Sequence, residues 1–188
     1  MTDLPLTGLR IAKDRASTER IAGACLAIVA DGVVLPFPKG WFDAITHSDL
    51  LCCLPGKRGV LKSCRNKIRA DCKMIFSVIS IRSGLTAADH ERAAASGPPF
   101  IETEIPYLEM LRQAGWEITD HRDLTAEYRV NVGRMLQNLE THAEEVAILF
   151  GDDDASNERA HIHATFESLE QGLLRRELFD VVPTVGNY

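Results

Sequence analysis

Apolar and polar positions along this chain predict helices and strands in alternation. Over residues 6–21, apolar side chains recur on one helical face, and Gly23 follows as a helix end. Residues 25–30 are a continuous apolar run, the pattern of a strand buried on both faces. Residues 43–46 and 73–81 predict two more strands, and the second is long, apolar and β-branched. A helix is predicted between these two strands, over residues 60–68.

The second half of the chain continues in the same order. We expect helices over residues 107–115, 124–150 and 158–172, and strands over residues 116–121 and 175–185. The charged residues 151–154 predict a helix-breaking loop. Residues 83–106 are rich in Ala, Glu and Pro, and predict a helix and loop over the sheet edge. The alternation predicts one α/β domain over residues 1–188, with a mostly parallel sheet containing strands 25–30, 43–46 and 73–81.

Composition narrows the class of partner. The chain has 188 residues and a net charge of −6, with no basic cluster, which argues against nucleic-acid and anionic-membrane partners. No apolar run approaches the roughly 20 residues that span a bilayer, and the first residues lack a signal pattern, so we expect a cytoplasmic location. Five cysteines without a C-x-x-C pair predict buried reduced thiols. His161 and His163 point apart on a helix, so no metal site is predicted.

Residues 30–55 read ADGVVLPFPKGWFDAITHSDLLCCLP. This stretch resembles the segment "D-x-x-x-LPFPDxxFDxV" that links the third and fourth strands of class I S-adenosylmethionine-dependent methyltransferases. The triplets at 114–116 and 123–125, AGW and DLT, and the last predicted strand, GLLRRELF at 172–179, are similar to later elements of that family. The resemblance implies a Rossmann-like sheet with an antiparallel C-terminal strand. It also implies methyl transfer from S-adenosylmethionine to a small-molecule acceptor.

The glycine-rich turn of that family, "VLDxGCGxG", has no counterpart in the sequence. The match begins at Asp3, so the resemblance implies a truncated sheet without its first strand and most of its second. Three outcomes are open: the remaining strands pair directly, two chains pair their exposed edges, or the region is partly disordered. We expect the first two together, a shortened sheet that forms a homodimer through its exposed edge.

The resemblance assigns cofactor-binding roles to residues near the chain's start. Asp3 would accept hydrogen bonds from the ribose hydroxyls, and Leu4 would touch the adenine or ribose. Asp31 would accept from the adenine amino group, beside the backbone of Gly32 and Val33. The alternatives are a frayed terminus for Asp3 and a simple Asp-Gly turn for Asp31.

The residues after the fourth strand of the family carry the expected chemistry, because ligands sit at the carboxyl ends of parallel strands. His47 is the candidate base for an alcohol, acid or amine acceptor, with a polar loop role as the alternative. Ser48 is expected to bind cofactor and Asp49 to bind substrate. Relatives often have His where this chain has Cys53.

By analogy with the family, Asp123 and Tyr128 would line the substrate mouth, although structural roles fit these two residues equally well. Three interpretations remain open for the whole protein. It is a small-molecule methyltransferase impaired by the missing turn, a non-catalytic methyltransferase-like binding or assembly protein, or a protein whose start lies upstream. Losing several cofactor hydrogen bonds at roughly 1–3 kcal/mol each would weaken cofactor binding by orders of magnitude.

Overall fold

The computed structural model describes residues 1–3 and 5–184. Leu4, an expected cofactor contact, and Val185, the expected last residue of the final strand, lie outside the described residues. The strands are β1 (Thr2–Asp3), β2 (Ile28–Val29), β3 (Phe42–Ser48), β4 (Ile68–Ile81), β5 (Trp116–Asp123) and β6 (Leu174–Pro183). The helices are α1 (Leu6–Thr18), α2 (Lys57–Lys67), α3 (Ala87–Ser96), α4 (Tyr107–Gln113), α5 (Thr125–Thr141), α6 (Ala143–Phe150) and α7 (Asp152–Glu170), with short 3₁₀ turns η1 (Ala22–Ala24) and η2 (Leu51–Cys53).

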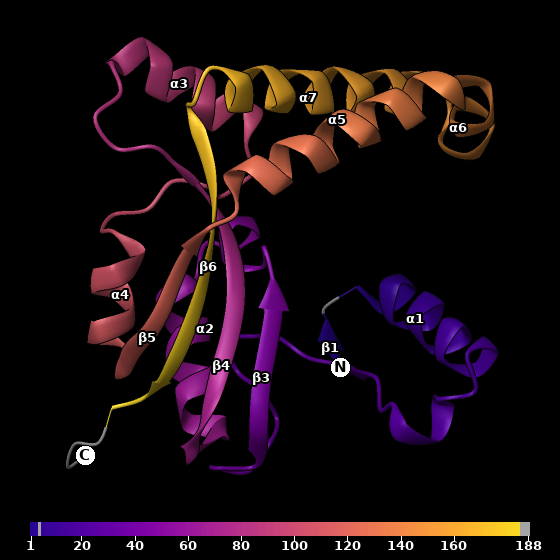
Figure 1. The fold of residues 1–188 in the computed structure, drawn as a ribbon. Helices are drawn as coiled ribbons and strands as arrows, with labels where there is room; N and C mark the ends of the chain where they lie inside the picture. The colour runs from indigo at the N-terminus through magenta and orange to yellow at the C-terminus, as the bar shows by residue number, and fades with distance from the viewer. Residues whose placement is uncertain (4, 185–188) are drawn as a thin grey trace.

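The main sheet has four strands in the order β3-β4-β6-β5. β3 is parallel to β4, and β6 is antiparallel to both β4 and β5 (Figure 1). Three of the four strands therefore share one direction. The predicted α/β class with an antiparallel C-terminal strand is confirmed.

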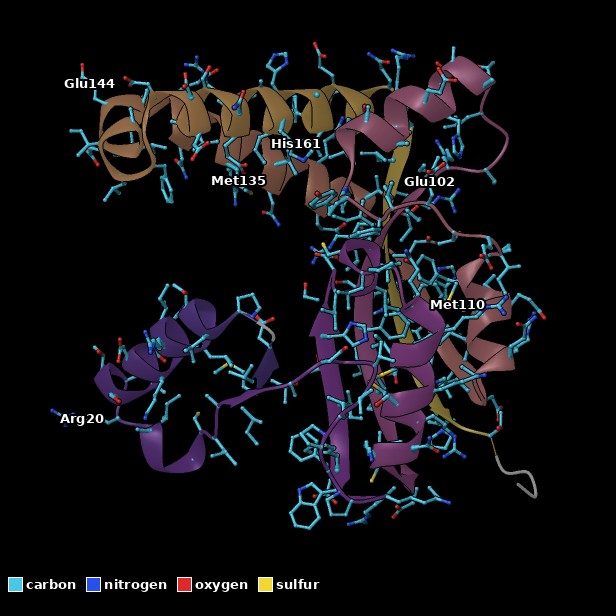
Figure 2. All side chains as sticks on the ribbon, turned by 180° about the vertical axis from the view of Figure 1, so that it is seen from behind. Arg20, Glu102, Met110, Met135, Glu144 and His161 are labelled. Atoms are coloured by element: carbon cyan, nitrogen blue, oxygen red, sulfur yellow. The ribbon has the colours of Figure 1, made fainter. Side chains whose placement is uncertain are left out.

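One face of this sheet packs against α2 and α4 and holds the larger core. Its fully buried side chains include Phe76, Trp116 and Phe179, one from each of three neighbouring strands. Trp116 also donates its indole N–H to the carbonyl oxygen of Leu61 on α2, at 3.1 Å. Figure 2, which views the molecule from behind, shows α2 across this face and Met110 on α4 beside it. Each large apolar side chain buried there stabilises the fold by about 1.5–3 kcal/mol.

A second core lies beyond the carboxyl end of β4, where α3, α5 and α7 pack together (Figure 1). It contains Ile79, Ala93, Val132 and Leu174, and Ser96 on α3 donates to Ser168 on α7 at 2.7 Å. The helix of the segment 83–106 thus contacts α7. In residues 1–3 and 5–184, every helix is too short or too polar to cross a lipid bilayer.

The N-terminal strands correct two expectations. Only Ile28–Val29 of the apolar run 25–30 is a strand, and Leu26 is 70% exposed. Moreover, β2 pairs with β1 in a separate two-stranded parallel sheet instead of joining β3 and β4. Within the described residues β1 is the one strand that pairs with β2, so the apolar run lacks a second neighbour. The expectation that the remaining strands close ranks is therefore wrong (Figure 1).

The long helix predicted over residues 124–150 is two helices. The chain turns at His142, whose φ of −112° and ψ of 28° leave the helical region. No Gly or Pro marks this break in the sequence, which is why the pattern missed it. Likewise, Gly151 has a φ of +88° and ends α6, but Asp152–Glu170 is already helix, so the predicted loop over 151–154 is a single residue. Three Asp in the first turn favour this start, because carboxylates complement the helix N-terminus.

Candidate functional site

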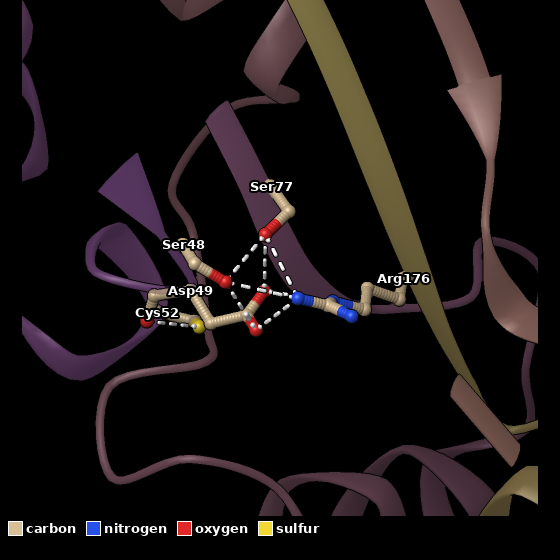
Figure 3. A network of polar contacts seen from close by, with 5 residues as sticks. All are labelled: Ser48, Asp49, Cys52, Ser77 and Arg176. Carbon is tan, nitrogen blue, oxygen red and sulfur yellow. Dashed lines mark hydrogen bonds and ion pairs between the residues drawn. The ribbon is translucent and has the colours of Figure 1, made fainter. Parts of the chain in front are cut away.

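A polar cluster lies where β3 ends. Asp49 follows β3 directly and has a φ of +51°, a left-handed conformation that costs a non-glycine residue about 1 kcal/mol or more. Arg176 on β6 reaches across β4 to this carboxylate, with 2.8 Å between Nη2 and Oδ2 and 3.1 Å between Nε and Oδ1 (Figure 3). A two-pronged guanidinium–carboxylate pair of this kind fixes orientation as well as charge.

Two serines and a backbone bond complete the cluster, and Figure 3 shows the contacts of the serine hydroxyls with Asp49 and Arg176. Ser77 on β4 donates its hydroxyl to Asp49 Oδ1 at 2.9 Å, and the amide of Asp49 donates to the carbonyl of Ser77 at 2.9 Å. Arg176 Nη2 donates to Ser48 Oγ at 2.9 Å. Cys52 donates its thiol to the carbonyl of Asp49 at 3.1 Å. These bonds hold the strained residue in place and tie three strands together at one end.

Tyr128 on α5 lies against the same cluster. The guanidinium carbon of Arg176 is 5.4 Å from the centre of the Tyr128 ring, a cation–π arrangement. Burial raises the pKa of the Tyr128 phenol to about 12, so the phenol stays protonated at neutral pH. The structure therefore brings together three residues named from the sequence, Ser48, Asp49 and Tyr128.

Sequence reasoning missed the residue that links them, Arg176. Two signals could have found it. Arg175 and Arg176 are charged residues in a strand that also carries core side chains, and Ser77 interrupts the most apolar strand of the chain. Polar residues in buried strands need partners, so they are candidates for one another.

His47 lies on the opposite face of β3 from Ser48, because successive side chains of a strand alternate. Its ring stacks on Phe76 with 4.8 Å between centroids. Neither ring nitrogen has a hydrogen-bond partner among the described residues, and both are buried. Desolvation lowers the pKa of His47 from 6.5 to about 4, against a smaller opposing effect of the Asp49 charge. The imidazole is therefore neutral at pH 7 and retains an unshared lone pair.

The stacking extends across the whole sheet. Phe76 stacks on Phe179 at 5.3 Å, and Phe179 stacks on His121 at 4.4 Å. At the far end His121 Nε2 lies 3.0 Å from Glu177 Oε1. A row of four rings, one from each strand of the main sheet, therefore begins and ends with a histidine.

The candidate cofactor carboxylates follow the two strands of the small sheet. Asp3 ends β1, and its carbonyl accepts a hydrogen bond from Ala30 N at 3.0 Å, so Asp31 follows at the same edge. Asp31 Oδ1 accepts from Val33 N at 2.9 Å, which is the turn considered as the alternative role for this residue. Its second carboxylate oxygen makes no bond within that turn.

Gly32 and Val33 lie beside the start of α2. A β-carbon at Gly32 would meet Val60 at 3.4 Å, and one at Gly59 would meet Val33 at 2.8 Å. Val33 thus packs into a space that only glycine leaves open, and this contact anchors the small sheet's loop to the main body.

The carboxylate of Asp123 binds within its own turn, while the next residues, Leu124 and Thr125, bond to the backbone of Arg176. Asp123 Oδ1 accepts from Thr125 N at 2.8 Å, and the hydrogen bonds to Thr125 lower the pKa of Asp123. It lines a separate cavity of about 370 Å³ together with Arg82 and Arg175. The expected placement of Asp123 beside Tyr128 in one mouth stays a prediction.

Comparisons with known proteins give likenesses of structure only. No family model matches the chain, and no curated protein matches it. A candidate sarcosine dimethylglycine methyltransferase from Galdieria sulphuraria matches with a TM-score of 0.87 at 11% identity, over 99% of this chain and 69% of that one. The [4+2]-cyclase SpnF matches with a TM-score of 0.78 at 19% identity, over 98% of this chain and 65% of that one.

A Haemonchus contortus phosphoethanolamine N-methyltransferase 2, in complex with phosphomonomethylethanolamine and S-adenosylhomocysteine, matches with a TM-score of 0.80 at 13% identity. That match covers 97% of this chain and 42% of the worm enzyme. This chain thus spans less than two thirds of the length of two of these three structures. The fold is that of the S-adenosylmethionine-dependent methyltransferases, an α/β sheet with a mixed strand order.

Proposed function

We propose that this chain is a methyltransferase of the S-adenosylmethionine-dependent class that acts on a small molecule, with weakened cofactor binding. The supporting observation is the set of polar groups at the carboxyl ends of parallel strands. Asp3 ends β1 and Asp31 comes shortly after β2, while Ser48 and Asp49 lie at the end of β3 and Ser77 lies on β4. In open α/β folds this side of the sheet is the ligand side.

The described residues fit one half of the cofactor. Asp3 and Asp31 offer carboxylate oxygens to the ribose diol and the adenine amine, beside Gly32 and Val33. Ser48 is the proposed cofactor contact from β3. For the methionine half, the sequence has no glycine-rich turn, and such turns supply the amides that receive a carboxylate. S-adenosylmethionine would supply the electrophilic methyl group when bound.

On the acceptor side, the proposal gives His47 the role of base and Asp49, Asp123 and Tyr128 roles in substrate binding. His47 is neutral at pH 7 and its ring nitrogens are unpaired among the residues described, so it could take a proton from an acceptor that reaches the Phe76 face of β3. Replacing His47 with Phe keeps the stacking on Phe76. We expect this variant to lose turnover while retaining its cofactor affinity.

A second candidate function is that of a non-catalytic methyltransferase-like binding or assembly protein. Two observations favour it: the missing glycine-rich turn, and an Arg176 guanidinium that is already paired with Asp49. Calorimetric titration of the 188-residue chain with S-adenosylmethionine separates the two candidates. The enzyme is supported if the chain binds S-adenosylmethionine with a Kd near the millimolar range (about −4 kcal/mol). Asp31→Ala should then abolish this binding, and the control Asp14→Ala should leave it unchanged. Absence of heat at millimolar ligand supports the binding protein, and micromolar affinity contradicts the proposed weakening.

We further propose that two copies associate through the open edge of β3. β3 pairs only with β4 in the part of the chain that is described, and an open strand edge is a template for pairing. Sedimentation velocity should show a dimer that Thr46→Lys on β3 disrupts. The control Thr18→Lys on α1 should leave the dimer intact, and a monomer at all concentrations contradicts the proposal.

A further inference from the structure

The helical arm formed by α5, α6 and α7 exposes a large apolar surface at its far end. Ile148, Leu149 and Phe150 of α6 are 83%, 76% and 66% exposed. In Figure 1 α6 lies at the end of the arm, away from the sheet. These three side chains are consecutive on α6, and the rest of the arm leaves each of them mostly uncovered. We call this end of the arm, residues 138–159, the arm tip.

A groove runs beside these side chains. It is a cavity of about 270 Å³ between α6 and the start of α7, and most of its walls are small or apolar. Leu139, Ala143, Val146, Ala147 and Ala155 line it. An apolar groove next to protruding apolar side chains is the kind of surface that accepts one face of an amphipathic helix.

The charge of the arm tip is strongly one-sided. The tip has seven acidic residues and one arginine, Arg159, so its net charge is −6. The entire chain also has a net charge of −6, so the positive and negative charges of the remaining residues cancel. All acidic side chains of the tip are exposed, and Figure 2 shows Glu144 at the end of the arm. The seven are Glu140, Glu144, Glu145, Asp152, Asp153, Asp154 and Glu158.

Helix capping explains only part of this acidity. Glu144, Glu145 and the three Asp lie in the first turns of α6 and α7, where carboxylates are stabilising. Glu140 instead lies in the last turn of α5, where a negative charge is unfavourable, and Glu158 lies beyond the first turn of α7. We call the seven acidic residues the rim. Helix stabilisation does not account for all of them, and they lie at the same end of the arm as the exposed apolar surface. This combination indicates an oppositely charged partner.

We propose that the arm tip docks a protein partner that presents a basic amphipathic helix. Its apolar face covers Ile148, Leu149 and Phe150 and enters the groove, while its Lys and Arg side chains pair with the rim. A second copy of this chain is disfavoured because two arm tips of net charge −6 would face each other. An anionic lipid surface is disfavoured for the same reason.

The test uses the full chain and a labelled synthetic helix of about 18 residues, with Leu on one face and Lys on the other. A matched peptide with Glu in place of Lys is the control ligand. We expect saturable binding of the Lys peptide by fluorescence anisotropy, and about tenfold weaker binding when salt is raised about tenfold. The triple variant I148S/L149S/F150S and the variant E140Q/E144Q/E145Q/E158Q should each bind at least about tenfold more weakly.

A matched variant controls for loss of exposed apolar surface in general. I11S/L26S/V34S removes three side chains that are 65%, 70% and 72% exposed elsewhere, and it should bind the Lys peptide as the parent chain does. Equal binding of the Glu peptide, or equal weakening in this control, would overturn the proposal. Two further results would overturn the proposal. One is self-association of the parent chain that is lost in I148S/L149S/F150S. The other is binding to phosphatidylcholine vesicles that depends on the arm tip, with no binding of the peptide. Titration with S-adenosylmethionine should be the same for parent and tip variants, which keeps this inference separate from the proposed enzyme.

Discussion

Arg176 on β6 forms a two-pronged ion pair with Asp49, a residue that follows β3, two strands away. Both side chains are mostly buried, at 21% and 24% exposed. The pair holds Asp49 in its left-handed conformation, so one side chain of the last strand fixes the geometry at the end of the first strand of the sheet.

Replacing Arg176 with Met should lower the free energy of unfolding by about 1–3 kcal/mol, because Asp49 would keep a mostly buried charge without its cationic partner. Urea denaturation measures this change. The free energy of unfolding of Arg176→Lys should lie between that of Arg176→Met and that of the parent, since an ammonium cannot make the two-pronged contact. A double-mutant cycle with Asp49→Asn should give a coupling free energy clearly above zero, and additive effects would contradict the pairing.

The stability of the fold should depend on pH through His47. Its folded pKa of about 4 is below its ordinary value of 6.5, so the unfolded state binds the proton more tightly. The contribution of neutral His47 to the free energy of unfolding is therefore complete above pH 6.5 and is lost as pH falls toward 4. This loss is at most on the order of 3 kcal/mol.

Unfolding curves of the parent and of His47→Phe, measured from pH 4 to about 7.5, isolate this effect. The difference between the two should shrink or reverse as pH falls, because the variant has no proton to take up at this site. A constant difference across the range would mean that His47 is not desolvated in the folded state.

Gly59 should resist replacement even though it lies in α2. Ala normally favours a helix over Gly by about 1 kcal/mol, but its β-carbon would lie 2.8 Å from Cγ1 of Val33. We expect Gly59→Ala to destabilise the chain by about 1–3 kcal/mol in thermal unfolding. The control Gly23→Ala, which meets nothing within 4 Å, should be nearly neutral. Adding Val33→Ala to Gly59→Ala should recover the loss if the clash is its cause.

Four of the five thiols should react in two groups with a maleimide at pH 8. Cys25 and Cys53 are exposed and should be modified first. Cys52 and Cys64 are buried, and desolvation raises their pKa values to about 12 and 11, so very little thiolate forms. Mass spectrometry of early time points tests this order. Early modification of Cys64 would show that the core of α2 opens readily.

The sequence pattern was reliable where the apolar side chains of an element pack against the rest of the protein. The apolar run in β4 and the helix of residues 107–113 were predicted because burial imposes a periodicity that a single sequence shows. The pattern was unreliable for residues 25–30, which resemble a buried strand but have a single strand neighbour, β1, among the described residues. A pattern records what a segment can bury, and the partner must be present for the burial to occur.

The candidate site shows the same limit. Motif resemblance located Ser48, Asp49 and Tyr128, because they follow recognisable strands. Arg176 is 127 residues from Asp49 along the chain, and only the antiparallel pairing of β4 with β6 brings the two together. The orientation of His47, facing away from Ser48, is likewise set by the pleat of β3 and not by any motif.

The row of rings from His47 through Phe76 and Phe179 to His121 gives each strand of the main sheet a spectroscopic probe. Ring currents shift the NMR signals of protons held above a neighbouring aromatic ring, and neighbouring rings here are 4.4–5.3 Å apart. The carbon-bound protons of the two histidines therefore report separately on the two outer strand pairs, β3 with β4 and β5 with β6. Slippage of either pair by one residue would turn its histidine to the other face and return that signal to its random-coil position.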